Sequence, residues 1–313
     1  MIEKIQKNKE AYRINMYYYK HARDAMFDAV KQLASKGYKD IYIPGYIGWS
    51  PKEGSGIFDP LNSISELTRH YYQMTRELSV DLKNLKEILK DHSILLVVNY
   101  FGFRDCSLPE IVKLAKGREC IVVEDNAHGF YTYYCNGSAG ADVTFFSLHK
   151  MFPFSVGGAL LIENPNIGIT ASDNIHEPAE LNPFTYDINA IARVRKNNFC
   201  ELMELMKGNE KYFLPLRNNR DIEKNVPQTF PIVIKKGDRD TIYEIMNDAG
   251  YGVVSLYHTM IEELRNGDHG DACWLSQRIM NLPIHQDVDP TEYQGMIDRL
   301  VIACEETEGG SSL

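Results

Sequence analysis

Two polar segments that follow apolar runs carry the residues best suited to chemistry. Residues 121–123 lead into Asp125, and residues 143–146 lead into a segment that contains Lys150. If both runs are strands of one sheet, a carboxylate and an amine stand where these strands end. Loss of solvation there favours the neutral amine, which can attack a carbonyl and form a Schiff base. A buried aspartate needs a partner, and a protonated pyridine nitrogen is a suitable one.

Together, Asp125 and Lys150 describe a site for pyridoxal 5'-phosphate (PLP). The simpler alternative is that both are exposed loop residues or form an incidental ion pair, because Asp and Lys are common in the turns after strands. The spacing of the two residues leaves both interpretations open.

Short apolar segments alternate with amphipathic ones around these residues. Helices are predicted over 21–35, 81–90 and 109–116, and strands over 40–44, 94–100, 120–124, 142–147 and 159–162. This alternation is typical of an α/β fold with a mostly parallel central sheet and helices on both faces. Because such sheets bind ligands at the carboxyl ends of their strands, we expect the site at the edge that carries Asp125 and Lys150.

The second half of the chain has a different pattern. A long helix is predicted over 187–207, strands over 228–235 and 252–257, and helices over 239–249 and 290–304. We therefore expect a large α/β domain over 1–175, a smaller C-terminal αβ domain over 176–305, and a mobile tail over 306–313.

The composition excludes several classes of protein. A net charge of -9 argues against a general nucleic-acid-binding surface but leaves room for a local anion site. The apolar runs are too short to span a membrane, and the polar amino terminus does not resemble a secretory signal, so we expect a cytoplasmic protein. The six Cys and nine His show neither Cys-x-x-Cys nor His-x-x-x-His spacing, so we expect no disulfide and no metal site.

A set of motifs resembles the signature of the DegT/DnrJ/StrS-type sugar aminotransferases, which belong to the aspartate aminotransferase superfamily (fold type I). The motifs are Val-Val-Glu-Asp-Asn-Ala-His-Gly over 122–129, Gly-Ala-Asp-Val-Thr-Phe-Phe-Ser over 140–147, Lys150, and Gly-Gly-Ala-Leu over 157–160. Shorter matches at 99–102, 252–253, 257–258 and 281–285 extend the resemblance in order over 21–304. Each piece is weak alone, whereas the set is specific.

The resemblance implies a role for each matching residue. Lys150 would hold PLP as the internal aldimine and move the proton during the reaction, and Asp125 would pair with the pyridinium nitrogen. His128 stands where the family usually has Gln and would approach the ring hydroxyl, while Ser147 would bind the phosphate. A hydrogen-bonded loop histidine and a turn-capping serine remain the alternatives for His128 and Ser147.

Three further cofactor contacts follow from the same resemblance. Ala22 and Arg23 begin the first predicted helix, whose backbone N–H groups would bind the phosphate, as helix amino termini favour anions. Trp49, in the loop after the strand at 40–44, would stack on the pyridine face. An exposed first turn and a loop aromatic that packs on the core are the alternatives.

The implied activity is a ping-pong transfer of an amino group. An amino acid, glutamate by the resemblance, would convert PLP to its amine form, which would then aminate a keto group on a nucleotide-linked sugar for polysaccharide or amino-sugar synthesis. The family forms its sites at dimer interfaces, which implies a homodimer. Tyr186, Tyr257, His258 and His285 are candidate substrate contacts, although residues of these types more often serve packing.

Some features depart from the family pattern. The spacing from Ser147 to Lys150 is shorter than in relatives, and Ser155-Val156 precedes Gly157-Gly158 where relatives carry Gly-Glu-Gly-Gly. Lys150 is kept, whereas the sugar dehydratases of the family have His there. Two other classes stay open: a non-catalytic member that binds the cofactor or a sugar nucleotide, and a Ser-x-x-Lys acyl enzyme, for which the required Lys-Thr-Gly element is absent from the sequence.

Overall fold

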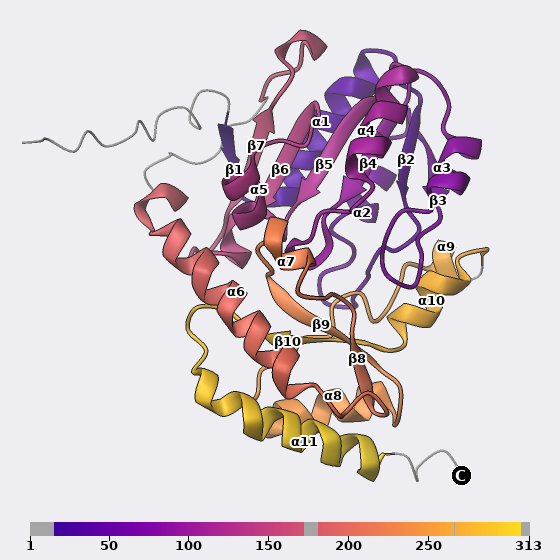
Figure 1. Ribbon diagram of the computed structural model, residues 1–313. Coiled ribbons are helices and arrows are strands. Elements are labelled where there is room, and N and C mark those ends of the chain that lie inside the picture. Colours follow the sequence, from indigo (N-terminus) through magenta and orange to yellow (C-terminus); the bar gives the residue numbers. More distant parts are fainter. Residues whose placement is uncertain (1–15, 172–180, 266, 308–313) are drawn as a thin grey trace, which may run out of the picture.

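A twisted sheet forms the centre of the larger part of the molecule (Figure 1). The computed structural model describes residues 16–171, 181–265 and 267–307. The seven strands lie in the order β1-β7-β6-β5-β4-β2-β3. Strands β3, β2, β4, β5 and β6 run parallel, and β7 and β1 are antiparallel to their neighbours. The strands are β1 Met16–Tyr19, β2 Asp40–Pro44, β3 Thr68–Tyr72, β4 Ile94–Val98, β5 Ile121–Asn126, β6 Val143–Ser147 and β7 Gly158–Ile162.

Helices cover both faces of this sheet, as the sequence predicts. Helix α1 (Ala22–Ser35) packs in the core that holds Phe145 and Leu160, whereas α5 (Phe130–Asn136) packs with Phe146 and Leu161. Because neighbouring residues of a strand point to opposite faces, α1 and α5 lie on opposite sides of β6 and β7. The other helices of this part are α2 Phe58–Asn62, α3 Leu82–Ile88 and α4 Leu108–Gly117.

A second, antiparallel sheet has the order β10-β9-β8 (Ile279–Pro283, Thr229–Ile234 and Phe213–Pro215). Figure 1 shows α8 (Arg239–Asp248) and α11 (Tyr293–Glu306) below it and α6 (Ile188–Leu205) along one side. The shorter helices are α7 Asp221–Lys224, α9 Glu262–Arg265 and α10 Gly270–Ser276. The division of the chain at residue 175 stays a prediction, and most of the expected tail lies outside the described residues.

The predicted strand over 252–257 is wrong. This segment makes one isolated bridge, between Val254 and Asn281, and otherwise runs as a loop. Gly252 and Tyr257 have φ angles of 61° and 62°, in the left-handed region that interrupts an extended strand. The loop therefore turns Tyr257 toward the larger sheet.

Two features are absent from the described ranges, a membrane-spanning helix and a metal-ligand cluster. Among the described helices, none combines the length and the apolar character that crossing a bilayer requires. Within the same ranges, no group of three or more His, Cys, Asp and Glu side chains is arranged to hold a metal ion.

Candidate active site

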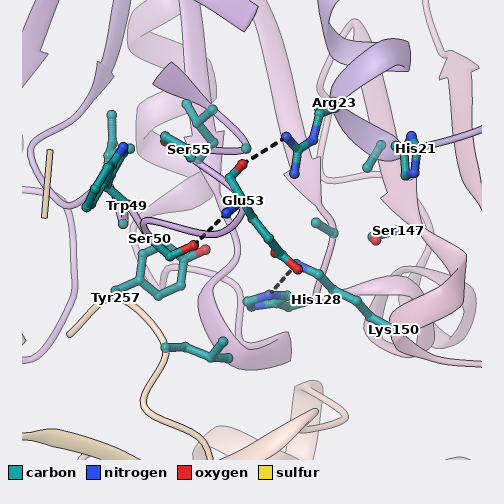
Figure 2. A pocket seen from close by; sticks show the side chains of 18 of the residues that line it. His21, Arg23, Trp49, Ser50, Glu53, Ser55, His128, Ser147, Lys150 and Tyr257 are labelled. Carbon is teal, nitrogen blue, oxygen red and sulfur yellow. Dashed lines mark hydrogen bonds between the residues drawn. The ribbon is translucent and has the colours of Figure 1, made fainter. Parts of the chain in front are cut away.

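The carboxyl ends of β5 and β6 bring the predicted catalytic residues to one edge of the sheet. The two strands are parallel neighbours in which Asp125 pairs in register with Phe145. Asp125 lies within β5, one residue before the strand ends, and Lys150 closes a short helical turn, Leu148–Lys150, that follows β6. Both side chains line one cavity of about 800 Å³, and Figure 2 shows Lys150 beside His128 in this cavity. Parallel pairing, which the strand pattern predicts, is what makes these chain-distant residues neighbours.

Lys150 presents its amine to this cavity. The side chain is exposed into the cavity, yet protein surrounds it closely enough that desolvation lowers the pKa of its amine below the ordinary value. The carboxylates of Asp125 and Glu53 act in the opposite direction, and the Arg23 cation adds to the lowering. The balance increases the fraction of neutral, nucleophilic amine at a given pH.

Asp125 is buried, with 5% of its surface exposed. Its carboxylate accepts a hydrogen bond from the Ala127 N–H at 2.8 Å. Burial raises its pKa to about 6, although this N–H and the Lys150 charge both favour the ionised form. A carboxylate held in this way gains much from a cationic partner in the cavity.

His128 contacts Lys150 directly. The His128 Nε2 atom lies 3.1 Å from the Lys150 Nζ atom, and the Phe101 N–H donates to Nδ1 at 3.3 Å. Burial lowers the pKa of His128 well below its ordinary value, and the Lys150 charge adds to the effect. The ring is therefore neutral near pH 7.

Polar groups at the start of α1 gather with Ser147 at the same cavity. His21, Ala22, Arg23, Ser147 and His149 all line it. Ser147 does not cap the turn that follows it; its Oγ atom lies 3.4 Å from the His149 Nδ1 atom. The Asp24 N–H of α1 donates to the His21 carbonyl oxygen at 3.2 Å, whereas the N–H groups of Ala22 and Arg23 precede the first intrahelical bond, so this end of the cavity suits an anion.

Gly158 allows β7 to approach the start of α1. A Cβ atom at this position would lie 2.2 Å from the backbone C and O atoms of His21 and 2.6 Å from the Ala22 nitrogen. Only glycine fits this approach without displacing the helix start. This close approach explains why the Gly-Gly motif has glycine at position 158, next to the anion end of the cavity.

The loop after β2 contributes Glu53, which the sequence analysis missed. The Arg23 guanidinium donates to the Glu53 carbonyl oxygen at 3.2 Å, and the Glu53 N–H donates to the Ser50 Oγ atom at 3.1 Å. Figure 2 shows the Glu53 side chain pointing from this turn toward Lys150. The side chain of Arg23 thus fixes the loop that contains Glu53. Because Arg23 lies in the first turn of α1, its backbone N–H remains available to bind an anion. No motif in the sequence marks Glu53.

Four residues predicted to contact cofactor or substrate lie in two different environments. Trp49, Tyr257 and His258 line the cavity, and Trp49 is 40% exposed there. Figure 2 shows Trp49 and Lys150 on opposite sides of the cavity, with Glu53 between them. Tyr186 instead packs on Phe152, with ring centroids 5.1 Å apart, in an aromatic cluster outside the lining.

His285 also lies away from the main cavity. It lines a second cavity of about 470 Å³ in the small αβ unit, and its Nδ1 atom is 3.5 Å from the Asp287 carboxylate. Ser255, which the sequence analysis did not select, does line the main cavity and accepts a hydrogen bond from Arg239 at 2.6 Å. The structure therefore does not bring Tyr186 or His285 to Lys150.

The residues present fit PLP by their chemistry. The cavity offers an amine with a lowered pKa, a buried carboxylate that a pyridinium would pair with, and an anion-favouring helix start beside Ser147. The Ser-x-x-Lys acyl enzyme is disfavoured, because the Lys150 amine faces His128 while the Ser147 hydroxyl faces His149.

Comparison with known families supports the same interpretation. Residues 75–172 match the DegT/DnrJ/EryC1/StrS aminotransferase family. The matched range contains Asp125, His128, Ser147 and Lys150, and the resemblance expected from the sequence is confirmed. A search of curated protein sequences found no match.

Several solved structures resemble most of this chain. An aminotransferase from Psychrobacter cryohalolentis is 12% identical, covers 95% of this chain and 89% of its own, and gives a TM-score of 0.76. The E. coli GDP-4-keto-6-deoxy-D-mannose-3-dehydratase with bound hydrated PLP is 17% identical, covers 91% and 87%, and gives 0.71. DesI, solved with its TDP-sugar product, is 14% identical, covers 92% and 80%, and gives 0.71. The predicted α/β fold is confirmed. The matched family and the Psychrobacter structure are described as aminotransferases, which is the predicted enzyme class, and the dehydratase structure contains PLP, which is the predicted cofactor.

Proposed function

We propose that this chain is a PLP-dependent aminotransferase that moves an amino group from an amino acid to the keto group of a sugar. The observation that carries the proposal is the meeting of Lys150 and Asp125 in one cavity, at the ends of adjacent parallel strands, inside the segment that matches the aminotransferase family. PLP, when bound, supplies an aldehyde for a lysine amine and a ring that accepts electrons from the substrate.

Different residues of the chain would serve in catalysis and in cofactor binding. The Lys150 amine would hold the cofactor and move a proton at the substrate carbon, for which its lowered pKa is suited. Asp125 would pair with the ring nitrogen of PLP, His128 would donate to the ring oxygen, and Ser147 with the start of α1 would hold the phosphate. Glu53 lies between the Lys150 end and the Trp49 end of the cavity.

The finer parts of the proposal concern the substrates and the assembly. We infer glutamate as donor and a nucleotide-linked keto-sugar as acceptor, because the matched family consists of aminotransferases and DesI was solved with a TDP-sugar product. A homodimer and a cytoplasmic location remain predictions from the sequence.

A spectrum of the purified protein with PLP, before and after glutamate, tests the proposal. Glutamate should shift the visible absorbance of the bound cofactor to that of its amine form, and borohydride reduction should place the cofactor mass on the peptide that contains Lys150. Lys150→Ala should abolish both results, whereas Lys113→Ala, on the exposed side of α4, should retain them.

The same experiment, followed by addition of a keto-sugar and analysis of the product, separates the alternatives. Bound PLP that does not respond to any amino acid would indicate a non-catalytic member of the family. A product that has lost a hydroxyl group and gained no nitrogen would indicate a dehydratase. Attachment at a residue other than Lys150 would refute the assignment.

A further inference from the structure

His128 packs in a cluster with two aromatic rings, those of Phe101 and Tyr257. Only 4% of its surface is exposed. Its ring stacks on Phe101 with a centroid distance of 6.0 Å and an interplanar angle of 21°, and it meets Tyr257 edge-on at 6.1 Å. These contacts hold the plane of the ring, so its two nitrogens have fixed partners.

The Phe101 backbone amide determines where the ring proton sits. This N–H points at the His128 Nδ1 atom at 3.3 Å. A backbone N–H can only donate, so Nδ1 must be the acceptor, and a neutral imidazole then carries its proton on Nε2. A doubly protonated ring would place a proton on Nδ1, directly against the Phe101 N–H. Because two donors cannot form a hydrogen bond, the contact also excludes this form.

The opposite nitrogen faces Lys150. The Nε2 atom lies 3.1 Å from the Lys150 Nζ atom (Figure 2). Because Nε2 carries the proton, it donates, and the lysine nitrogen must accept. An ammonium group has no lone pair to accept with. The contact is therefore compatible with the neutral amine and opposes the ammonium.

The Phe101 amide cannot turn away at low cost. Phe101 has a φ angle of 57°, and its carbonyl accepts the Gln228 N–H at 2.8 Å. Gly102 follows with a φ angle of 89°, and a Cβ atom there would lie 2.6 Å from the Val226 carbonyl oxygen. A left-handed residue that persists at a site is held by its surroundings. Segment 226–228 of the small unit thus fixes the donor that orients His128.

We propose that the Phe101 amide, acting through His128, holds the Lys150 nitrogen as a neutral hydrogen-bond acceptor in the cofactor-free chain. His128 is the residue that touches the amine, and Phe101 is the positioning residue. The proposal deepens the proposed function and rests on it only for the use of the neutral amine, which is the form that condenses with an aldehyde.

The charged groups around Lys150 do not by themselves require this state. Asp125 on β5 and Glu53 in the loop after β2 favour the ammonium, whereas Arg23 on α1 opposes it. Burial lowers the pKa of both Lys150 and His128. A substitution of His128 can reverse which of the two residues donates the hydrogen bond between them, while the other groups around Lys150 stay in place.

Nitrogen-resolved NMR of the cofactor-free chain tests the tautomer. We expect the His128 ring to carry its proton on Nε2 near neutral pH, with Nδ1 in the unprotonated form. A proton on Nδ1, or on both nitrogens, would overturn the proposal. This measurement needs neither PLP nor activity, so it remains decisive even if the proposed function fails.

His128→Gln and His128→Glu form a matched pair for the second test. Both side chains can accept from the Phe101 N–H through one oxygen, but Gln then presents an N–H donor to Lys150 and Glu presents an acceptor. The readout is the pH dependence of Lys150 labelling by a trace acylating reagent, followed by peptide mass spectrometry. Circular dichroism and thermal unfolding establish that both variants are folded.

The two variants should differ in the apparent pKa of Lys150. His128→Gln should keep it near that of the parent chain, whereas His128→Glu should raise it by about one unit or more, slowing labelling near neutral pH by about tenfold. Equal profiles in the two folded variants, or a rise with Gln as large as with Glu, would overturn the proposal. Failure of the parent chain to bind PLP would count against the proposed function alone.

Discussion

Replacing Asp125 with Asn tests whether the buried, ionised carboxylate of Asp125 lowers the free energy of unfolding. Burial raises the pKa of Asp125 from an ordinary value of 3.8 to about 6. That difference corresponds to about 3 kcal/mol when the carboxylate is ionised in both the folded and the unfolded chain. Asn is close to Asp in shape, carries no charge, and can still accept the Ala127 N–H. The variant should therefore be more stable than the parent near neutral pH.

The sign of the pH dependence follows from the direction of the shift. The folded chain binds the Asp125 proton more tightly than the unfolded chain, so this group favours the folded state at low pH and loses that contribution as the pH rises toward 6. The advantage of Asp125→Asn should be about 3 kcal/mol at about pH 7.5 and should shrink to about 1 kcal/mol at about pH 4.5. Urea unfolding of the cofactor-free chains at the two pH values measures it.

A matched control distinguishes this effect from a general loss of negative charge. Asp142 is also buried, but its carboxylate accepts from the Val122 N–H at 2.9 Å and from the Asn164 side chain at 2.8 Å. Asp142→Asn should destabilise the chain, because an amide cannot accept both bonds in the same way. An Asp125→Asn variant that is no more stable than the parent at the higher pH, or whose advantage does not change with pH, would refute the reasoning.

Two further predictions concern the anion end and the outer end of the cavity. Gly158→Ala should destabilise the chain by about 1–3 kcal/mol and weaken PLP binding, because its Cβ would meet the His21 backbone at 2.2 Å; Gly117→Ala, with open space around it, should do neither. Urea unfolding and a PLP titration measure both effects, and equal behaviour of the two variants would argue against the close approach. PLP should also shield the exposed, cavity-lining Trp49 from acrylamide quenching. Trp274→Phe, which leaves Trp49 as the only tryptophan, should show this protection and Trp49→Phe should not; the reverse pattern would place the ligand elsewhere.

The sequence by itself determined the local elements that depend on short-range patterns. The apolar runs that become β4, β5 and β6 are buried along their whole length, which is why their composition alone identified central strands. The spacing of apolar residues in α1 likewise predicted the helix to within one residue. Asp125 and Lys150 could be selected because they follow such strands and lie within the set of motifs that resembles the aminotransferase signature, whereas their spacing alone left a simple loop or ion pair open.

Other parts of the site depended on contacts between distant segments. Strand β1 is defined by its pairing with β7, and Glu53 enters the cavity because Arg23 holds its loop. The apolar pattern of residues 252–257 favours a strand, but the segment forms a loop instead. The loop conformation places Tyr257 against His128.

Which candidate residues share a cavity was decided by tertiary structure alone. Tyr257 and His258 reach the cavity, whereas Tyr186 packs in an aromatic cluster and His285 lines another cavity. The tautomer proposed for His128 depends on the Phe101 amide, in the turn after β4, whose carbonyl accepts the Gln228 N–H of the small unit. Local periodicity fixes which face of an element is apolar, but the direction of a loop and the partner of a polar atom are fixed by groups far along the chain, whose positions only the packed fold defines.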